Sequence, residues 1–246
     1  MKLFSMAVAA LVATLSFATP AHAQEKSGNK PGFTLKPGTV RIVVMRPTIQ
    51  VGSQSTGGLN EPNADWTAQA REYISKALRD HQTNLGNEVV EYAEGVTSDG
   101  PMVAQYSHLF GAVADSVIEY QFFPGNRLDT KKRKDSFEWG IGGGLAQLKS
   151  LEGADYALFI NTHDQYGSTG RKMLQLFAAV GGVSVSSGVH VGHAGLIDMK
   201  TGELVWLNAD RQMGGDVRTP EGAAKRVAQL LEGFPGRPAE AKTAAK

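Results

Sequence analysis

The sequence predicts an α/β (α+β) domain with a single mixed β-sheet, packing helices, and a C-terminal β-hairpin followed by a helix. Three stretches carry this prediction: VRIVVM at residues 40–45, ADYALFIN at 154–161, and AGLIDMKTGELVWLN at 194–208. The first two are short apolar runs, and the third is a pair of apolar runs around a turn. Strands that alternate with helices in this way predict one sheet covered by helices.

The first strand and helix follow from composition and capping. Residues 40–45 are β-branched and apolar, as in a strand buried on both faces, and Pro47 ends the run. The polar, glycine-rich residues 51–62 predict a loop. Asn63 can cap a helix that reaches about His81, because the apolar residues that follow lie on one helical stripe.

The middle of the chain predicts further alternation of strands and helices. Residues 88–92 predict a second strand, and residues 102–122 carry apolar side chains at helical spacing. We expect a third helix from about Trp139 to Leu151, a short helix at 171–180, and a glycine- and serine-rich strand at 183–191.

The hairpin at 194–208 is predicted to be core scaffold. Gly202 supplies the turn, and the flanking apolar side chains face the interior: Leu196, Ile197, Leu204, Val205 and Trp206. Thr219 caps the final helix, at 220–232, and Pro220 occupies its first turn. Two strands alone are marginally stable, so the hairpin needs helices packed against it.

The N-terminus predicts export. Lys2, an apolar stretch from Met6 to Phe17, and Ala21-His22-Ala23 form a signal-peptide pattern, with cleavage expected after Ala23. We therefore expect a signal peptide at 1–23, a flexible leader at 24–38, a single domain at 39–234 and a disordered tail at 235–246. The mature protein is expected to be soluble, because it contains no second long apolar stretch. The signal peptide predicts that it is periplasmic.

Composition excludes several classes of function. The chain has 25 Lys and Arg residues against 24 Asp and Glu, and a neutral chain lacks the charge that bulk nucleic-acid binding requires. It contains no cysteine, which excludes disulfides, thiol catalysis and thiolate metal sites. The glycine run at 140–144 follows charged residues instead of a buried strand, so it does not predict a dinucleotide-binding loop. No cofactor is predicted.

The sharpest enzymatic hypothesis is a metal-dependent periplasmic hydrolase that uses His163, Asp164, His190 and His193. In it His163 and Asp164 are the candidate catalytic residues, and the three histidines are the candidate metal ligands. Residues three apart in a strand point to opposite faces, so His190 and His193 can share an ion only if a bulge turns one of them. The alternative is that these histidines make ordinary hydrogen bonds within the fold.

Two further groups of residues could bind a ligand or a partner. Arg218 and Thr219 lie at the start of the final helix, where backbone amides can bind an anion, or they close a structural turn. Lys131, Lys132 and Arg133 could contact anionic lipid head groups or an acidic partner, or they belong to a solvated loop.

The segment 153–232 resembles the envelope proteins related to the curli-secretion lipoprotein and the amino-terminal domain of the Tol-Pal translocation protein. In that group an "ADY" strand precedes a hairpin of the form D-x-x-T-G-x-x-x-W, which Asp198, Thr201, Gly202 and Trp206 match. The resemblance implies a compact α/β domain that acts in envelope assembly or export without catalysis. The chain departs from the lipoproteins of the group because it has no cysteine for a lipid anchor.

These observations together predict a non-catalytic binding or assembly factor of the bacterial cell envelope. Its expected partner is another, unidentified envelope protein, and self-association into a homo-oligomer is a further option. The hydrolase described above is the alternative.

Overall fold

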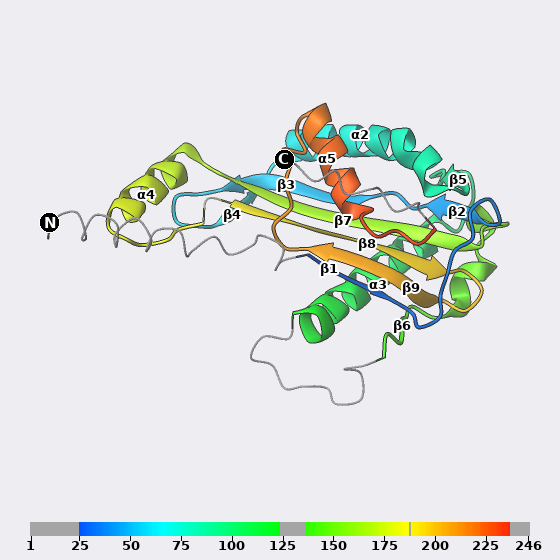
Figure 1. Ribbon diagram of the computed structural model, residues 1–246. Helices are drawn as coiled ribbons and strands as arrows, with labels where there is room; N and C mark the ends of the chain where they lie inside the picture. The colour runs from blue at the N-terminus through cyan, green and yellow to red at the C-terminus, as the bar shows by residue number, and fades with distance from the viewer. Residues whose placement is uncertain (1–24, 124–135, 187, 237–246) are drawn as a thin grey trace, which may run out of the picture.

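The computed structural model describes residues 25–123, 136–186 and 188–236. Nine strands form one mixed sheet, in which the longest run of neighbours has the order β1-β9-β8-β7-β2-β5. Helices cover both faces of this sheet (Figure 1). The architecture predicted from the sequence, a single mixed α+β sheet with packing helices, is confirmed.

The parallel half of the sheet is built around β7 (Tyr156–Gly167). Strand β2 (Arg41–Val44) lies between β7 and β5 (Glu88–Glu91) and runs parallel to both. After the break at Pro47, β3 (Thr48–Gln54) continues along the same side of β7 and pairs with β4 (Asn60–Pro62).

Strands β3 and β4 correct the loop expected at 51–62. Strand β3 begins three residues before that range, at Thr48, and Ile49 and Val51, which alternate along it, are both buried. Thr56 and Gly57 in the turn and the three residues of β4 are exposed, whereas Gly52 and Gln54 of β3 are buried, because β3 pairs with both β4 and β7.

The antiparallel half consists of β8 (Gly188–Asp198), β9 (Glu203–Asp210) and two strands that pair with β9. One is the short β6 (Trp139–Gly140), and the other is β1 (Glu25–Asn29). Strand β1 lies inside the stretch expected to be a flexible leader. The structure differs there because backbone pairing to β9, which needs no apolar sequence, holds these polar residues in place.

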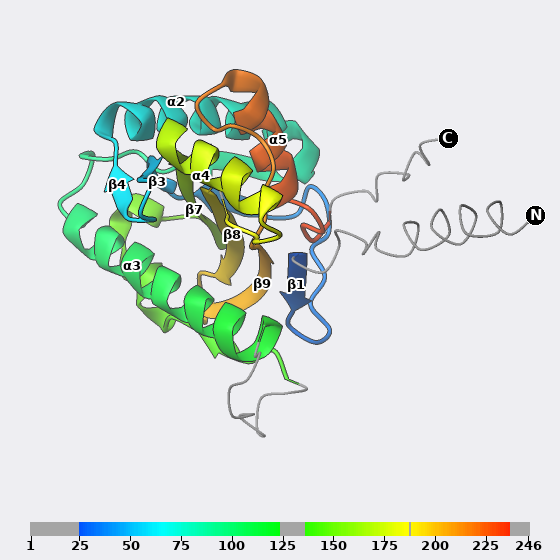
Figure 2. The same cartoon turned by 90° about the vertical axis from the view of Figure 1, so that its left-hand side faces the viewer.

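The sheet separates two apolar cores. On one face, α2 (Ala64–His81) and α5 (Pro220–Leu230) pack side by side over the sheet, as Figure 2 shows. On the other face, α3 (Gly100–Val117) and the π turn after it (Ile118–Phe122) cover the sheet. Both cores are lined by alternate residues of the same strands, so Leu158 faces the first core and Phe159 the second.

Both predicted helix caps are present. The side chain of Asn63 accepts a hydrogen bond from the backbone N–H of Trp66 at 2.9 Å, and Thr219 accepts one from Gly222 at 3.1 Å. The third predicted helix is wrong, because residues 139–151 form β6 and two short 3-10 turns. The four glycines between residues 140 and 144 cost too much backbone entropy for an α-helix.

The predicted hairpin is confirmed as scaffold. Its apolar side chains are all at most 2% exposed: Leu196, Ile197, Leu204, Val205 and Trp206. In the turn, Asp198 accepts hydrogen bonds from the backbone of residues 200 and 201, and Gly202 has a φ of 71°. Among the described residues, no helix is long and apolar enough to cross a membrane.

Candidate functional site

The predicted hydrolase residues lead to a buried ion pair. The Asp164 carboxylate accepts two hydrogen bonds from Arg226, each at 2.8 Å, and one from His190 Nδ1 at 2.8 Å. Asp164 and Arg226 are fully buried, and Thr162 bridges them through its hydroxyl group. Arg226 also donates to the backbone carbonyls of residues 214 and 215, so α5 is tied to the loop that precedes it.

The surroundings of Asp164 favour its charged form. Burial acts to raise the pKa of Asp164, but the hydrogen bonds from His190 and Arg226 outweigh burial and lower it. A carboxylate whose oxygen atoms already accept hydrogen bonds from three side chains, those of Arg226, His190 and Thr162, has little capacity left for a metal ion or a substrate proton. This cluster therefore has the geometry of a structural link between β7, β8 and α5.

The remaining predicted ligands lie elsewhere. His163 is on the opposite face of β7 from Asp164 and contacts Gln50, with 3.1 Å between its Nδ1 and the amide oxygen. His193 lies in the core beneath α3, with its ring centroid 5.7 Å from that of Phe110. The structure thus does not bring His163, His190 and His193 together. In the described part of the chain, no group of three or more His, Asp or Glu side chains could hold a metal ion.

Arg218 and Thr219 are engaged within the protein. Arg218 forms a two-pronged ion pair with Asp216, at 2.9 and 2.7 Å, and its guanidinium group stacks 3.7 Å from the ring centroid of Tyr166. This pairing lowers the pKa of Asp216 to about 2. Thr219 is the cap of α5, as described above. The arrangement agrees with the structural turn considered from the sequence, whereas Lys131, Lys132 and Arg133 lie outside the described residues.

The helix α4 (Thr169–Val180) carries a group of exposed apolar side chains. It connects β7 to β8 and lies at one end of the sheet, apart from the other helices (Figure 1). None of its residues is buried, and five of its large apolar side chains are between 41% and 85% exposed: Met173, Leu174, Leu176, Phe177 and Val180. We call these five residues the outer face of α4.

The orientation of α4 is the reverse of that of an ordinary surface helix. Arg171, Gln175 and Ala178, at positions i, i+4 and i+7, are half-buried and face the body of the protein. Arg171 donates hydrogen bonds to the carbonyls of Ser186, at 2.8 Å, and of Thr56, at 3.5 Å. Polar contacts thus hold the helix to the body, while its apolar side faces solvent.

The sequence predicts a helix at 171–180 but not its outward apolar face, although it contains a signal for that face. Residues 173–180 are apolar except for Gln175, and no acidic residue occurs between Asp164 and Asp198. Periodicity identifies such a helix as amphipathic but does not say which side meets the body. Only the contacts of Arg171 determine the orientation.

Comparisons with known proteins give weak structural similarities. No protein-family model matches the chain, and no curated protein matches it. A structure of a variant PelC dodecamer from Paraburkholderia phytofirmans is 13% identical, with a TM-score of 0.38, over 84% of this chain and 94% of that one. A second PelC dodecamer structure is 14% identical, with a TM-score of 0.36, over 84% of this chain and 93% of that one.

A DUF4136 family protein from Bacteroides thetaiotaomicron is also similar. It is 10% identical, with a TM-score of 0.32, over 85% of this chain and 93% of that one. No family model supports the resemblance of residues 153–232 to the curli-secretion and Tol-Pal proteins, which stays a prediction.

Proposed function

We propose that this protein is a non-catalytic binding or assembly factor of the bacterial cell envelope, exported to the periplasm, which recognises another envelope protein. The observation that carries the proposal is the outer face of α4. Five large apolar side chains on a helix of twelve residues are turned away from the body of the protein. A contiguous exposed apolar patch of this kind is typical of an interaction site.

Energetics favour a protein partner that covers this face. Full burial of a Leu or Phe side chain contributes about 1.5–3 kcal/mol, so burial of Leu176 and Phe177 would supply several kcal/mol of binding free energy. Phe177 is 67% exposed and Leu176 is 59% exposed, and neither contributes to a core of this chain. Their exposure therefore costs solubility without stabilising the fold.

The buried cluster around Asp164 supports binding over hydrolysis. Its carboxylate is saturated by Arg226 and His190, and His163 points away from it. The export signal at residues 1–23, which lies outside the described residues, supports the envelope as the compartment.

A capture experiment tests this function. The mature chain is immobilised, incubated with detergent-solubilised envelope extract, and crosslinked. We expect the double variant Leu176→Ser/Phe177→Ser to lose the captured partner protein while its melting temperature stays the same, because these side chains make no core contacts.

The matched control is Val96→Ser/Leu109→Ser, which also replaces two exposed apolar residues, 74% and 42% exposed, but outside α4. This control should capture the partner as the unmodified chain does. Equal capture by both double variants would contradict the proposal. Capture of only a second copy of the chain would assign the outer face to self-association.

A further inference from the structure

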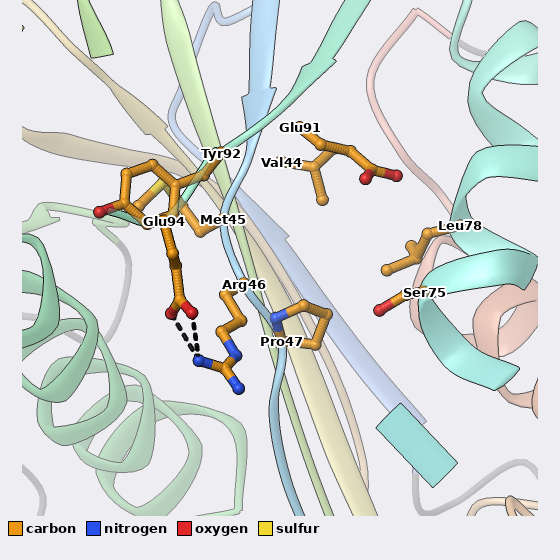
Figure 3. Close-up of a pocket in the computed structure, with 9 residues that line it drawn as sticks. All are labelled: Val44, Met45, Arg46, Pro47, Ser75, Leu78, Glu91, Tyr92 and Glu94. Atoms are coloured by element: carbon orange, nitrogen blue, oxygen red, sulfur yellow. Dashed lines mark hydrogen bonds and ion pairs between the residues drawn. The ribbon is translucent and has the colours of Figure 1, made fainter. Parts of the chain in front are cut away.

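A groove lies where β2 ends and β3 begins. Two adjoining hollows, of about 230 and 480 Å³, share the residues at its centre: Met45, Arg46, Pro47, Tyr92 and Glu94. Figure 3 shows these residues on the ends of β2 and β5, with Ser75 and Leu78 of α2 across the opening. The larger hollow extends to Arg71 of α2 and to the first half of α3. Its volume is in the range of small-ligand pockets.

The topology of the sheet explains why the groove forms there. Strands β2 and β5 are parallel neighbours whose carboxyl ends meet at the same edge. The chain that leaves β2 continues as β3 along β7 and reaches α2 only after β4, whereas the chain that leaves β5 leads to α3. Helices α2 and α3 lie on opposite faces of the sheet (Figure 2). The two connections therefore separate and leave a crevice, which is where open α/β sheets commonly bind ligands.

The larger hollow contains two arginines, Arg46 and Arg71, and one carboxylate, Glu94. Glu91, which lines the smaller hollow, pairs with Arg79 outside the groove at 3.4 Å. Arg46 contacts both carboxylate oxygens of Glu94 through Nη1 alone, at 2.6 and 2.5 Å, and makes no hydrogen bond through its other nitrogens to the residues the structure describes. The side chain of Arg71 makes no hydrogen bond or ion pair within the described residues, although its Nε atom is buried. A buried guanidinium N–H without an acceptor is unfavourable, and an anionic ligand would supply one.

The walls beside these arginines are mainly apolar, with Gln50, Ser107 and His108 as polar members. Ile49, Val103 and Ala104 line the larger hollow together with Met45 and Pro47. A ligand that fits must therefore combine an anionic head with a hydrocarbon body. The two guanidinium groups match the geometry of carboxylate and phosphate oxygens, which accept paired N–H donors.

We propose that this groove binds a small organic anion, with its carboxylate or phosphate held by Arg71 and Arg46 and its apolar body placed against Val103 and Ala104. The groove is independent of the outer face of α4. Binding of an anion there requires no protein partner.

The test measures binding of hexanoate and hexyl phosphate to the mature chain by NMR titration, with hexan-1-ol as the neutral probe. We expect one or both anions to bind saturably, to shift the signals of His108 and Tyr92, and to bind at least tenfold more tightly than hexan-1-ol. The relative affinities of the two anions then distinguish a carboxylate from a phosphate ligand.

Arg71→Gln should lower the affinity for the anion at least tenfold, and Arg71→Lys should keep part of that affinity. Lys76→Gln is the matched control, because it removes one positive charge from an exposed position of the same helix outside the groove. Equal affinity of the Arg71→Gln and Lys76→Gln variants would overturn the proposal. So would equal binding of hexan-1-ol, or failure of both anions to bind the unmodified chain.

Discussion

The polar residues that the chain buries differ in how they are accommodated. Asp164 and Arg226 satisfy each other, so removal of either partner would leave an uncompensated buried charge. His193 is accommodated differently, because it is buried among apolar side chains and its Nε2 atom has no hydrogen-bond partner among the described residues. Burial lowers the pKa of His193 to about 4, so the ring stays neutral in the folded protein.

The pKa of His193 predicts a stability change in mildly acidic solution. The unfolded chain takes up a proton at this ring near pH 6.5 and the folded chain only near pH 4, so stability falls as the pH decreases between these values. Between pH 7 and pH 4.5 we expect a loss of about 2–3 kcal/mol, measured by urea unfolding. His193→Leu should remove this loss, whereas His108→Gln, at an exposed position, should retain it. Parallel pH profiles for the unmodified chain and His193→Leu would contradict the prediction.

At the scale of elements, α4 and α5 show that one pattern can be used in two ways. Both are short amphipathic helices with a side-chain cap at the first turn. Helix α5 buries Val227 and Leu230 against the sheet, whereas α4 turns Phe177 to solvent.

The turn of the hairpin between β8 and β9 requires a glycine for two separate reasons. Gly202 has a positive φ of 71°, and a Cβ atom added there would lie 2.0 Å from the carbonyl oxygen of Gly142. Gly202→Ala should therefore destabilise the protein by about 2 kcal/mol or more, from backbone strain and the clash together. Gly32→Ala is the control, because its φ is 75° but no atom lies within 4 Å of the added Cβ. We expect a cost of only about 1 kcal/mol there. Equal losses in thermal unfolding would show that the contact with Gly142 does not matter.

At the scale of the whole molecule, the N-terminal strand closes one edge of the sheet. Residues 25–29 pair with residues 206–210, which belong to the hairpin far along the chain. Trp206 and Leu207 of this hairpin are fully buried, one in each core. Strand β1 therefore covers the backbone edge of β9, a strand that contributes side chains to both cores.

A chain that lacks residues 24–30 should expose the β9 edge. We expect a lower melting temperature and concentration-dependent self-association, because an uncovered edge offers free N–H and C=O groups to other chains. Thermal unfolding and light scattering after size-exclusion chromatography measure the two effects. The control is a chain shortened by the same length at residues 240–246. If both shortened chains behave like the unmodified one, β1 does not stabilise the sheet.

The sequence predicted those parts of the molecule in which local pattern and final environment agree. The runs at 40–45 and 154–161 became buried strands, Asn63 and Thr219 became caps, and the hairpin at 194–208 became core. Strand β1 was missed because its residues are polar and are held by backbone hydrogen bonds to a distant strand. Local composition contains no information about such a partner.

The candidate sites depended on tertiary structure more strongly. The sequence determined that His163 and Asp164 are neighbours and that residues 173–180 form an apolar helical stripe. Only the fold decided that the two neighbours face opposite sides of β7 and that Arg226, 62 residues away, neutralises Asp164. Only the fold decided that the apolar side chains of α4 face solvent. It also decided that Arg46 and Arg71 line the same groove. The physical reason is that charges and apolar faces act through the neighbours that long-range packing gives them, and these neighbours are distant in the sequence.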